Sequence, residues 1–254
     1  MGWTAGRIPG ALALVALLGS VPSAAQDMAL EIVQRSEALM RGERAVGSYR
    51  ITILRPGWQR VLEFDSWVDG TRQSFILIKA PAKERGVTFL KLGREMWQYV
   101  PRINRVVKLP PSMMMQSWMG SGFTNDDLVR SSSLVEDYEH SLVGTLATTE
   151  GEAWQIELKT RPEAPVAWDR MLMWIRTADY LPVKAEFYNE RAELVRTMTY
   201  SEFRLVGGRT LPSRMELTEE RFADRKTILD IVSMSFDEAI DPGVFTQRNL
   251  RRSR

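Results

Sequence analysis

The side chains that most often carry catalysis are scarce in this sequence. It contains one histidine, His140, and no cysteine, which excludes a histidine pair for a metal, an H-E-x-x-H motif and a thiol nucleophile. A serine nucleophile would depend on His140, which lies in a polar run with no G-x-S-x-G elbow beside it. We therefore expect His140 to be exposed and to have no chemical role.

Two further patterns are weak as functional motifs. Gly120-Ser121-Gly122 lacks the following lysine and the strand-to-helix context of a phosphate-binding loop. The acidic pairs Asp126-Asp127 and Glu219-Glu220 are typical of solvated turns. The sequence therefore predicts a binding protein, with no enzymatic activity, no metal site and no cofactor.

The N-terminus predicts a signal peptide over residues 1–25. Arg7 precedes an apolar run of about eight residues, and small side chains stand at Ser23 and Ala25. The run is much shorter than the roughly 20 residues that span a bilayer as a helix, and no cysteine follows it for lipid attachment. We expect cleavage after Ala25 and a soluble, periplasmic mature chain of residues 26–254.

The mature chain is nearly neutral. Removing Arg7 with the signal peptide leaves 33 of the 34 Lys and Arg residues against 32 Asp and Glu. This balance argues against a nucleic-acid partner. Without cysteine there is no disulfide framework, so the hydrophobic core alone must hold the fold.

A helix is expected at the start of the mature chain, capped by Asp27 and ending near Arg41. Its apolar side is formed by residues at three- and four-residue spacing. These residues are Leu30, Val33, Leu39 and Met40.

From Gly42 almost to the C-terminus the hydrophobic period changes to two, which predicts strands. The Asp69-Gly70 pair between two such runs indicates a tight hairpin. Residues 75–78 and 171–175 are apolar on both faces, as expected for central strands that are covered on both sides. We count about ten to eleven strands and no βαβ alternation, so we predict a single antiparallel β domain over residues 26–254.

Residues 112–123, the Met-rich segment, interrupt this alternation. Four methionines, Trp118 and Phe123 follow Pro110-Pro111, and Thr124 or Asn125 could cap a short helix next. Methionine is unbranched and polarizable, so such a segment can adapt to different apolar partners. Spacing alone leaves two interpretations open: a plug for one end of the sheet, which it favours, or a contact surface for a ligand.

Several stretches resemble the LolA-like outer-membrane lipoprotein-sorting family, over roughly Ser48 to Leu250. The stretches are Met96–Pro101, Arg105–Val107, Ser117–Leu128, Leu181–Lys184, Leu194–Tyr200 and Gly207–Pro212, together with Phe245 near the end. The fold that this resemblance implies is mainly β: an incomplete, half-open antiparallel β-barrel with an apolar inner side, covered by an N-terminal helix and a short helical lid.

The resemblance implies a monomeric periplasmic carrier that binds lipoprotein acyl chains or other lipids. It would receive this cargo from an inner-membrane exporter, of ABC or RND type, and pass it to an outer-membrane acceptor. The alternative is a lipid sensor or an accessory subunit of such an exporter, which would regulate partners instead of carrying cargo.

The resemblance also favours the lid interpretation of the Met-rich segment. The expected ligand contacts are Trp97, Tyr99, Met113, Met114, Met115, Trp118, Met119 and Phe123. If the segment is a lid, Trp118→Ala should weaken lipid binding while leaving the melting temperature almost unchanged. If it is a plug, the same change should cost about 3–5 kcal/mol of stability.

Overall fold

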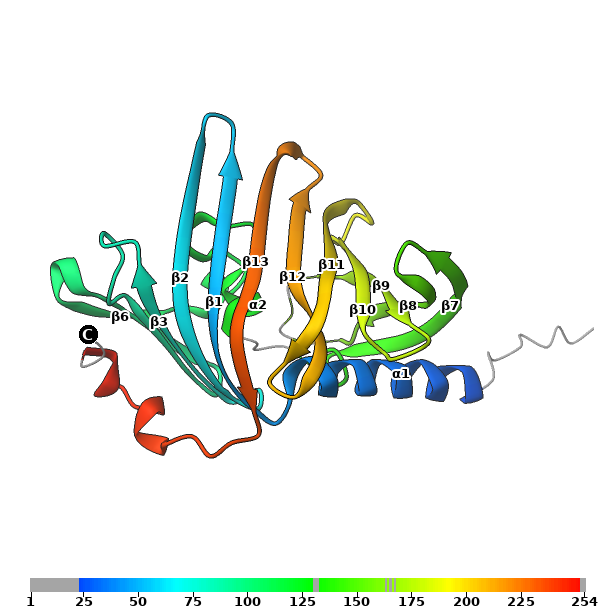
Figure 1. The fold of residues 1–254 in the computed structure, drawn as a ribbon, viewed down its shortest axis with the longest axis horizontal. Helices are drawn as coiled ribbons and strands as arrows, with labels where there is room; N and C mark the ends of the chain where they lie inside the picture. The colour runs from blue at the N-terminus through cyan, green and yellow to red at the C-terminus, as the bar shows by residue number, and fades with distance from the viewer. Residues whose placement is uncertain (1–22, 130–132, 163, 165, 167, 252–254) are drawn as a thin grey trace, which may run out of the picture.

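A computed structural model describes residues 23–129, 133–162, 164, 166 and 168–251. All thirteen of its strands belong to one antiparallel sheet in the order β6-β5-β4-β3-β2-β1-β13-β12-β11-β10-β9-β8-β7. The sheet curves without closing, because β6 and β7 lie at its opposite ends (Figure 1). Most of the predicted signal peptide, residues 1–22, lies outside the described residues.

The strands fall into two halves on either side of the Met-rich segment. The first half consists of β1 (Arg44–Arg55), β2 (Trp58–Asp69), β3 (Gln73–Ala80), β4 (Thr88–Leu92), β5 (Glu95–Val100) and β6 (Arg105–Leu109). The second consists of β7 (Tyr138–Thr148), β8 (Gly151–Thr160), β9 (Arg170–Arg176), β10 (Pro182–Tyr188), β11 (Leu194–Val206), β12 (Arg209–Glu219) and β13 (Phe222–Phe236). The last strand, β13, crosses back to pair with β1 and joins the halves.

The predicted mainly β, half-open antiparallel architecture is confirmed, but the predicted number of strands was too low. Strands as short as β4, with five residues, give only two or three positions per face, too few for a clear period of two. The longer alternations hold. In β12, Met215 and Leu217 are buried on the inner face, whereas Arg214 and Glu216 are partly exposed.

The expected hairpin at Asp69-Gly70 is confirmed, and a second glycine turn joins β11 to β12. Gly70 has a φ of +54° in the turn between β2 and β3. Gly207 and Gly208 both have positive φ between β11 and β12, which is the backbone that a two-residue type I′ turn requires.

Helix α1 (Ser23–Arg41) ends where it was predicted to end but begins four residues before Asp27. Its buried side is formed by Ala29, Ile32, Val33 and Ser36, so only Val33 of the four residues expected there is buried. Helix α1 packs against β7 and β12. In the part of the chain that the structure covers, no helix is long and apolar enough to span a membrane.

The largest apolar cluster lies on the inner face of the sheet, the face that also packs against α1. Strand β3 is covered on both faces, as predicted, but it is the fourth strand from the β6 end of the sheet and not a central one. In β3, Ile76 and Ile78 join the inner cluster, whereas Phe75 lies in a separate cluster with Phe245 and Leu250 of the C-terminal segment. This segment forms two short 3₁₀ turns, η4 (Pro242–Phe245) and η5 (Asn249–Arg251), on the outer face of β3 and β4.

The Met-rich segment lies inside the curve of the sheet and leads into helix α2 (Asn125–Val129). It contains the 3₁₀ turns η2 (Pro111–Met113) and η3 (Trp118–Gly120); a third such turn, η1 (Pro101–Ile103), precedes β6. Thr124 caps α2 as predicted: its hydroxyl accepts a hydrogen bond from the Asp127 amide at 3.1 Å, and its own amide donates to the Asp127 carboxylate at 2.7 Å. This reciprocal pair is a capping box.

Candidate functional site

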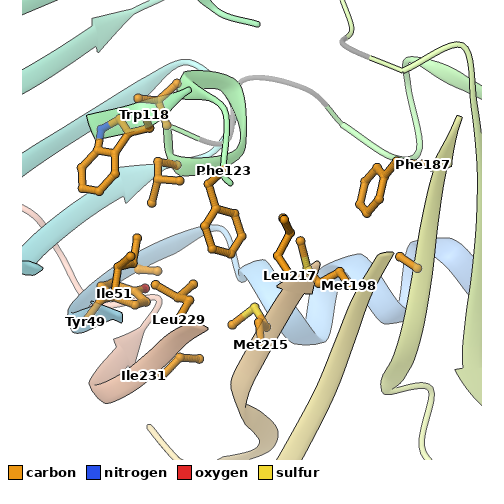
Figure 2. Packing of buried hydrophobic residues seen from close by; sticks show 14 of the residues in the cluster. Tyr49, Ile51, Trp118, Phe123, Phe187, Met198, Met215, Leu217, Leu229 and Ile231 are labelled. Carbon is orange, nitrogen blue, oxygen red and sulfur yellow. The ribbon is translucent and has the colours of Figure 1, made fainter. Parts of the chain in front are cut away.

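A cavity of about 240 Å³ lies between the inner face of the sheet, α1 and α2. Its wall combines strands that are far apart in the sequence, β1 and β2 with β9 to β13, because β13 pairs with β1 in the sheet. Figure 2 shows the space between Phe123, which descends from the Met-rich segment, and Phe187 of β10, with Met198 and Met215 below.

Methionine is the most frequent side chain in the cavity wall. The five methionines are Met40, Met171, Met173, Met198 and Met215. They come from α1, β9, β11 and β12. Thioether side chains change rotamer easily and have a polarizable sulfur, so this wall can adapt to guests of different shape.

Aromatic rings complete the apolar part of the wall. Tyr49 stacks on Phe64 with ring centroids 5.2 Å apart, and both line the cavity together with Phe123 and Phe187. The Tyr49 hydroxyl lies 3.7 Å from the Met234 sulfur. The site therefore has the character of an apolar ligand pocket with few polar groups.

The polar groups of the cavity gather toward α1 and α2. Glu37 of α1 accepts hydrogen bonds from the Leu134 and Val135 amides, both at 3.3 Å, and from Arg41 at 2.8 Å. These contacts join the residues after α2 to α1. They occupy the Glu37 carboxylate, which is consequently a structural anchor and not a free base.

A buried ion pair connects α2 to the sheet across the cavity. Arg196 of β11 is 2% exposed and donates two hydrogen bonds to Asp127, at 2.7 and 2.9 Å. Its guanidinium also lies over the rings of Trp168 and Phe187, 4.3 and 4.1 Å from their centroids. A bidentate pair with this stacking is geometrically specific.

Burial alone would raise the pKa of Asp127. The charge and hydrogen bonds of Arg196, together with the Thr124 donors, outweigh it and hold that pKa below its usual range. Asp127 therefore remains a carboxylate at neutral pH. The expectation that Asp126-Asp127 forms a solvated turn was wrong, because Asp126 is also buried.

Two other ionisable groups differ from their expected or usual state. Burial lowers the pKa of Lys91 to about 8, although the Asp126 charge opposes this. His140 is buried, not exposed as expected, and its Nε2 donates to the Leu134 carbonyl at 2.7 Å. Burial lowers the pKa of His140 too. In the described residues no group of three or more His, Asp or Glu side chains is arranged to hold a metal ion.

The structure places the eight predicted ligand contacts in different environments. Phe123 lines the cavity. Met113, Met114 and Met119 are partly buried against the inner cluster, whereas Met115 is 40% exposed. Trp97 and Tyr99 belong to the outer cluster with Phe245 and Leu250, so a guest in the cavity does not reach them.

Trp118 is completely buried beside the cavity and is not part of its wall. Its ring packs against Phe64 and Phe89, at 5.2 and 5.7 Å between centroids, and its indole nitrogen has no hydrogen-bond partner. A contact between Trp118 and cargo remains a prediction that requires the Met-rich segment to move. The methionines that do line the cavity were signalled only by the helical spacing that includes Met40 and by the apolar positions of the predicted strands.

The unclosed antiparallel sheet with an N-terminal helix is the LolA-like fold. A DUF1329 family protein from Desulfovibrio piger ATCC 29098 is 19% identical with a TM-score of 0.80, over 89% of this chain and 99% of that chain. The LolA superfamily protein NE2245 from Nitrosomonas europaea is 22% identical with a TM-score of 0.74, over 87% of this chain and 98% of that chain.

A domain from Vibrio parahaemolyticus that is named for outer membrane lipoprotein sorting is 19% identical with a TM-score of 0.77, over 89% of this chain and 100% of that chain. At such identities the similarity shows the fold. Residues 70–252 match the model of a family described as "Uncharacterized protein", and the chain belongs to that family. No curated protein matches the sequence.

Proposed function

We propose that this protein is a non-enzymatic carrier that holds an acyl chain of a lipoprotein or another lipid in the cavity. One observation carries the proposal: an apolar cavity of about 240 Å³ inside a LolA-like sheet, with methionines in its wall. An apolar cavity of about 150 Å³ is large enough to bind benzene and stays free of water. The cavity of this protein is larger, and the methionine and aromatic side chains of its apolar wall suit hydrocarbon.

The expected affinity is moderate and fits reversible binding. Each methylene group transferred from water contributes about 0.8 kcal/mol, so six buried methylenes supply roughly 5 kcal/mol before the cost of ordering the chain. The cavity admits only part of a long acyl chain. A whole chain requires Phe123 and the rest of the Met-rich segment to withdraw from the inner face.

The proposed setting is the periplasm, after removal of residues 1–25. There the chain would accept lipid from an inner-membrane exporter and deliver it to an outer-membrane acceptor. The resemblance to the lipoprotein-sorting family and the N-terminal pattern of Arg7 and the apolar run support this route.

The test fills the cavity. Met198→Trp places a larger apolar side chain in the empty space, so we expect an unchanged or higher melting temperature and at least several-fold weaker binding of a fluorescent fatty acid. The matched control is Leu146→Trp on β7, where the side chain is 39% exposed and lies outside the cavity. Equal affinity in the two variants would mean that the fatty acid does not bind in this cavity.

The natural cargo can be identified on the same protein. We expect mass spectrometry of the mature chain, purified from a native periplasm without detergent, to show co-purifying lipids or lipopeptides. The Met198→Trp variant should carry much less of them.

A further inference from the structure

Two neighbouring hairpins extend beyond the rest of the sheet at the same end (Figure 1). One joins β1 to β2 and turns between Arg55 and Trp58; the other joins β12 to β13 and turns between Glu219 and Phe222. Because β1 pairs with β13 along its length, the two tips are adjacent.

Each tip presents an aromatic side chain to the solvent. Trp58 is 50% exposed and Phe222 is 43% exposed, although rings of this size usually bury most of their surface. Arg225 stacks on the Phe222 ring, with its guanidinium carbon 3.7 Å from the centroid. Cationic side chains outnumber acidic ones in residues 55–60 and 219–226: Arg55, Arg60, Arg221, Arg225 and Lys226 stand against Glu219, Glu220 and Asp224. Arg55 pairs with Glu219 and Lys226 with Glu216, which leaves Arg221 and Arg225 as the cations closest to the Phe222 tip.

Tryptophan and arginine are the side chains that suit a membrane surface. The indole prefers the depth of the lipid headgroups, and arginine keeps its charge at the phosphates while its stem lies against hydrocarbon. From the adjacent aromatic tips and their cationic surplus we infer that the two hairpins dock on an anionic phospholipid surface, and that docking releases the Met-rich segment from the inner face.

Two arginines of the β1–β2 hairpin, Arg55 and Arg60, hold the backbone of the Met-rich segment. Arg60 donates to the Met119 carbonyl, and Arg55 donates to the Gly120 carbonyl at 3.3 Å. The segment is kinked between these contacts: Met119 has a φ of +52°, which is unfavourable for a residue with a side chain, and Gly120 has a φ of +77°. Two arginines of the β1–β2 hairpin therefore hold a strained turn in place.

A lipid phosphate competes for the same arginines. Hydrogen bonds from arginine to a charged phosphate oxygen are shorter and stronger than those to a neutral carbonyl. The buried Nε of Arg60 has no hydrogen-bond partner in the described structure, so reorientation of this side chain would allow that donor to form a hydrogen bond. Once both carbonyls are free, the strain at Met119 favours departure of the segment and access to the cavity.

The first experiment measures docking, with vesicles of phosphatidylethanolamine and phosphatidylglycerol in a flotation assay. We expect the cargo-free wild-type chain to float with these vesicles, less well with pure phosphatidylcholine vesicles, and the double variant Trp58→Ser, Phe222→Ser to lose binding several-fold. Leu205→Ser is the matched control, because Leu205 is 71% exposed but lies away from the tips. Equal flotation of the wild type and the double variant would overturn the inference, and so would failure of the wild type to float.

The second experiment measures release, by hydrogen exchange of residues 118–122. Vesicles should accelerate exchange there in the wild type and leave it unchanged in the double variant. Docking without this acceleration would refute the coupling.

The inference rests on the proposed function, but the two can fail separately. Fatty-acid binding without vesicles reports on the cavity, and the double variant should retain it. If the wild-type protein docks on vesicles but binds no fatty acid, the proposed carrier function is refuted and the proposed membrane docking stands. Weak fatty-acid binding by the double variant would contradict the assignment of Trp58 and Phe222 to docking alone.

Discussion

Replacing Trp118 separates the energetic effect of its ring from that of its indole N–H. The side chain is completely buried between Phe64 and Phe89, and its nitrogen has no partner. Trp118→Ala deletes the ring and leaves a cavity, so the expected loss is about 3–5 kcal/mol. For a chain of this size that corresponds to a fall of roughly 6–20 °C in melting temperature.

Trp118→Phe should behave differently. The smaller ring leaves a void that costs on the order of 1 kcal/mol. The same change removes a buried donor without a partner, whose desolvation costs about 1–3 kcal/mol in the wild type. The two effects oppose each other, so we expect the Phe variant to be between as stable as wild type and about 2 kcal/mol more stable.

The assay is urea unfolding at 25 °C, with equal slopes for all three proteins so that the midpoints report stability. A loss for Trp118→Phe that equals the loss for Trp118→Ala would refute the reasoning, because the N–H would then have a partner in solution. The lid interpretation of the sequence predicts an almost unchanged melting temperature for Trp118→Ala. The complete burial of the ring leads us to expect a large fall instead.

Three further predictions test the sheet, the ion pair and the N-terminus. Ile156→Asp places an unpaired carboxylate at a fully buried position and should unfold the chain. Glu157→Gln removes one partner of a partly exposed salt bridge and should melt like wild type. Similar melting temperatures for the two variants would contradict the assignment of Ile156 to the buried face of β8. Arg196→Met should cost about 3 kcal/mol in urea unfolding, near the lower end for a broken buried pair because Asp127 retains some exposure. The pKa of Asp127 is lower in the folded state than in the unfolded chain. The stability that the Asp127–Arg196 pair contributes is therefore complete above the ordinary carboxyl pKa of about 4 and is lost as the pH falls through the folded-state pKa. A loss of this stability already at pH 6 would argue against the ion pair. Intact-mass measurement of the periplasmic protein should show a chain that begins at Gln26, and a full-length chain in the membrane fraction would contradict the predicted cleavage.

Features with a local physical cause could be predicted from the sequence. Alternation along a strand such as β12 depends only on the period of two, the turn at Asp69-Gly70 depends on positive φ, and the cap at Thr124 depends on the four residues from Thr124 to Asp127. The alternation and the turn lie where they were expected, and Thr124 is one of the two residues expected to cap the helix. The start of α1 was misplaced, because Asp27 is a good cap by type but lies inside the helix.

Features that depend on long-range contacts could not be predicted. Asp127 and Arg196 are 69 residues apart, and nothing local indicates that they pair. Trp97 and Tyr99 alternate correctly along β5, but the sequence does not reveal which face of that strand is the inner one. The conspicuous run of methionines drew attention to the Met-rich segment, whereas the methionines of the cavity wall are dispersed over four elements.

The contacts of the Met-rich segment differ in kind from those of the sheet, and this difference bears on how the cavity opens. Arg55, Arg60 and Thr227 hold the backbone of this segment through single hydrogen bonds, each worth a net 0.5–1.5 kcal/mol or about twice that when charged. Water or phosphate can replace such bonds. Trp118 is the opposing element, because its withdrawal exposes a large buried ring. The segment should therefore open at a free energy below that of global unfolding, set mainly by Trp118, and a guest that covers the exposed ring lowers that free energy further.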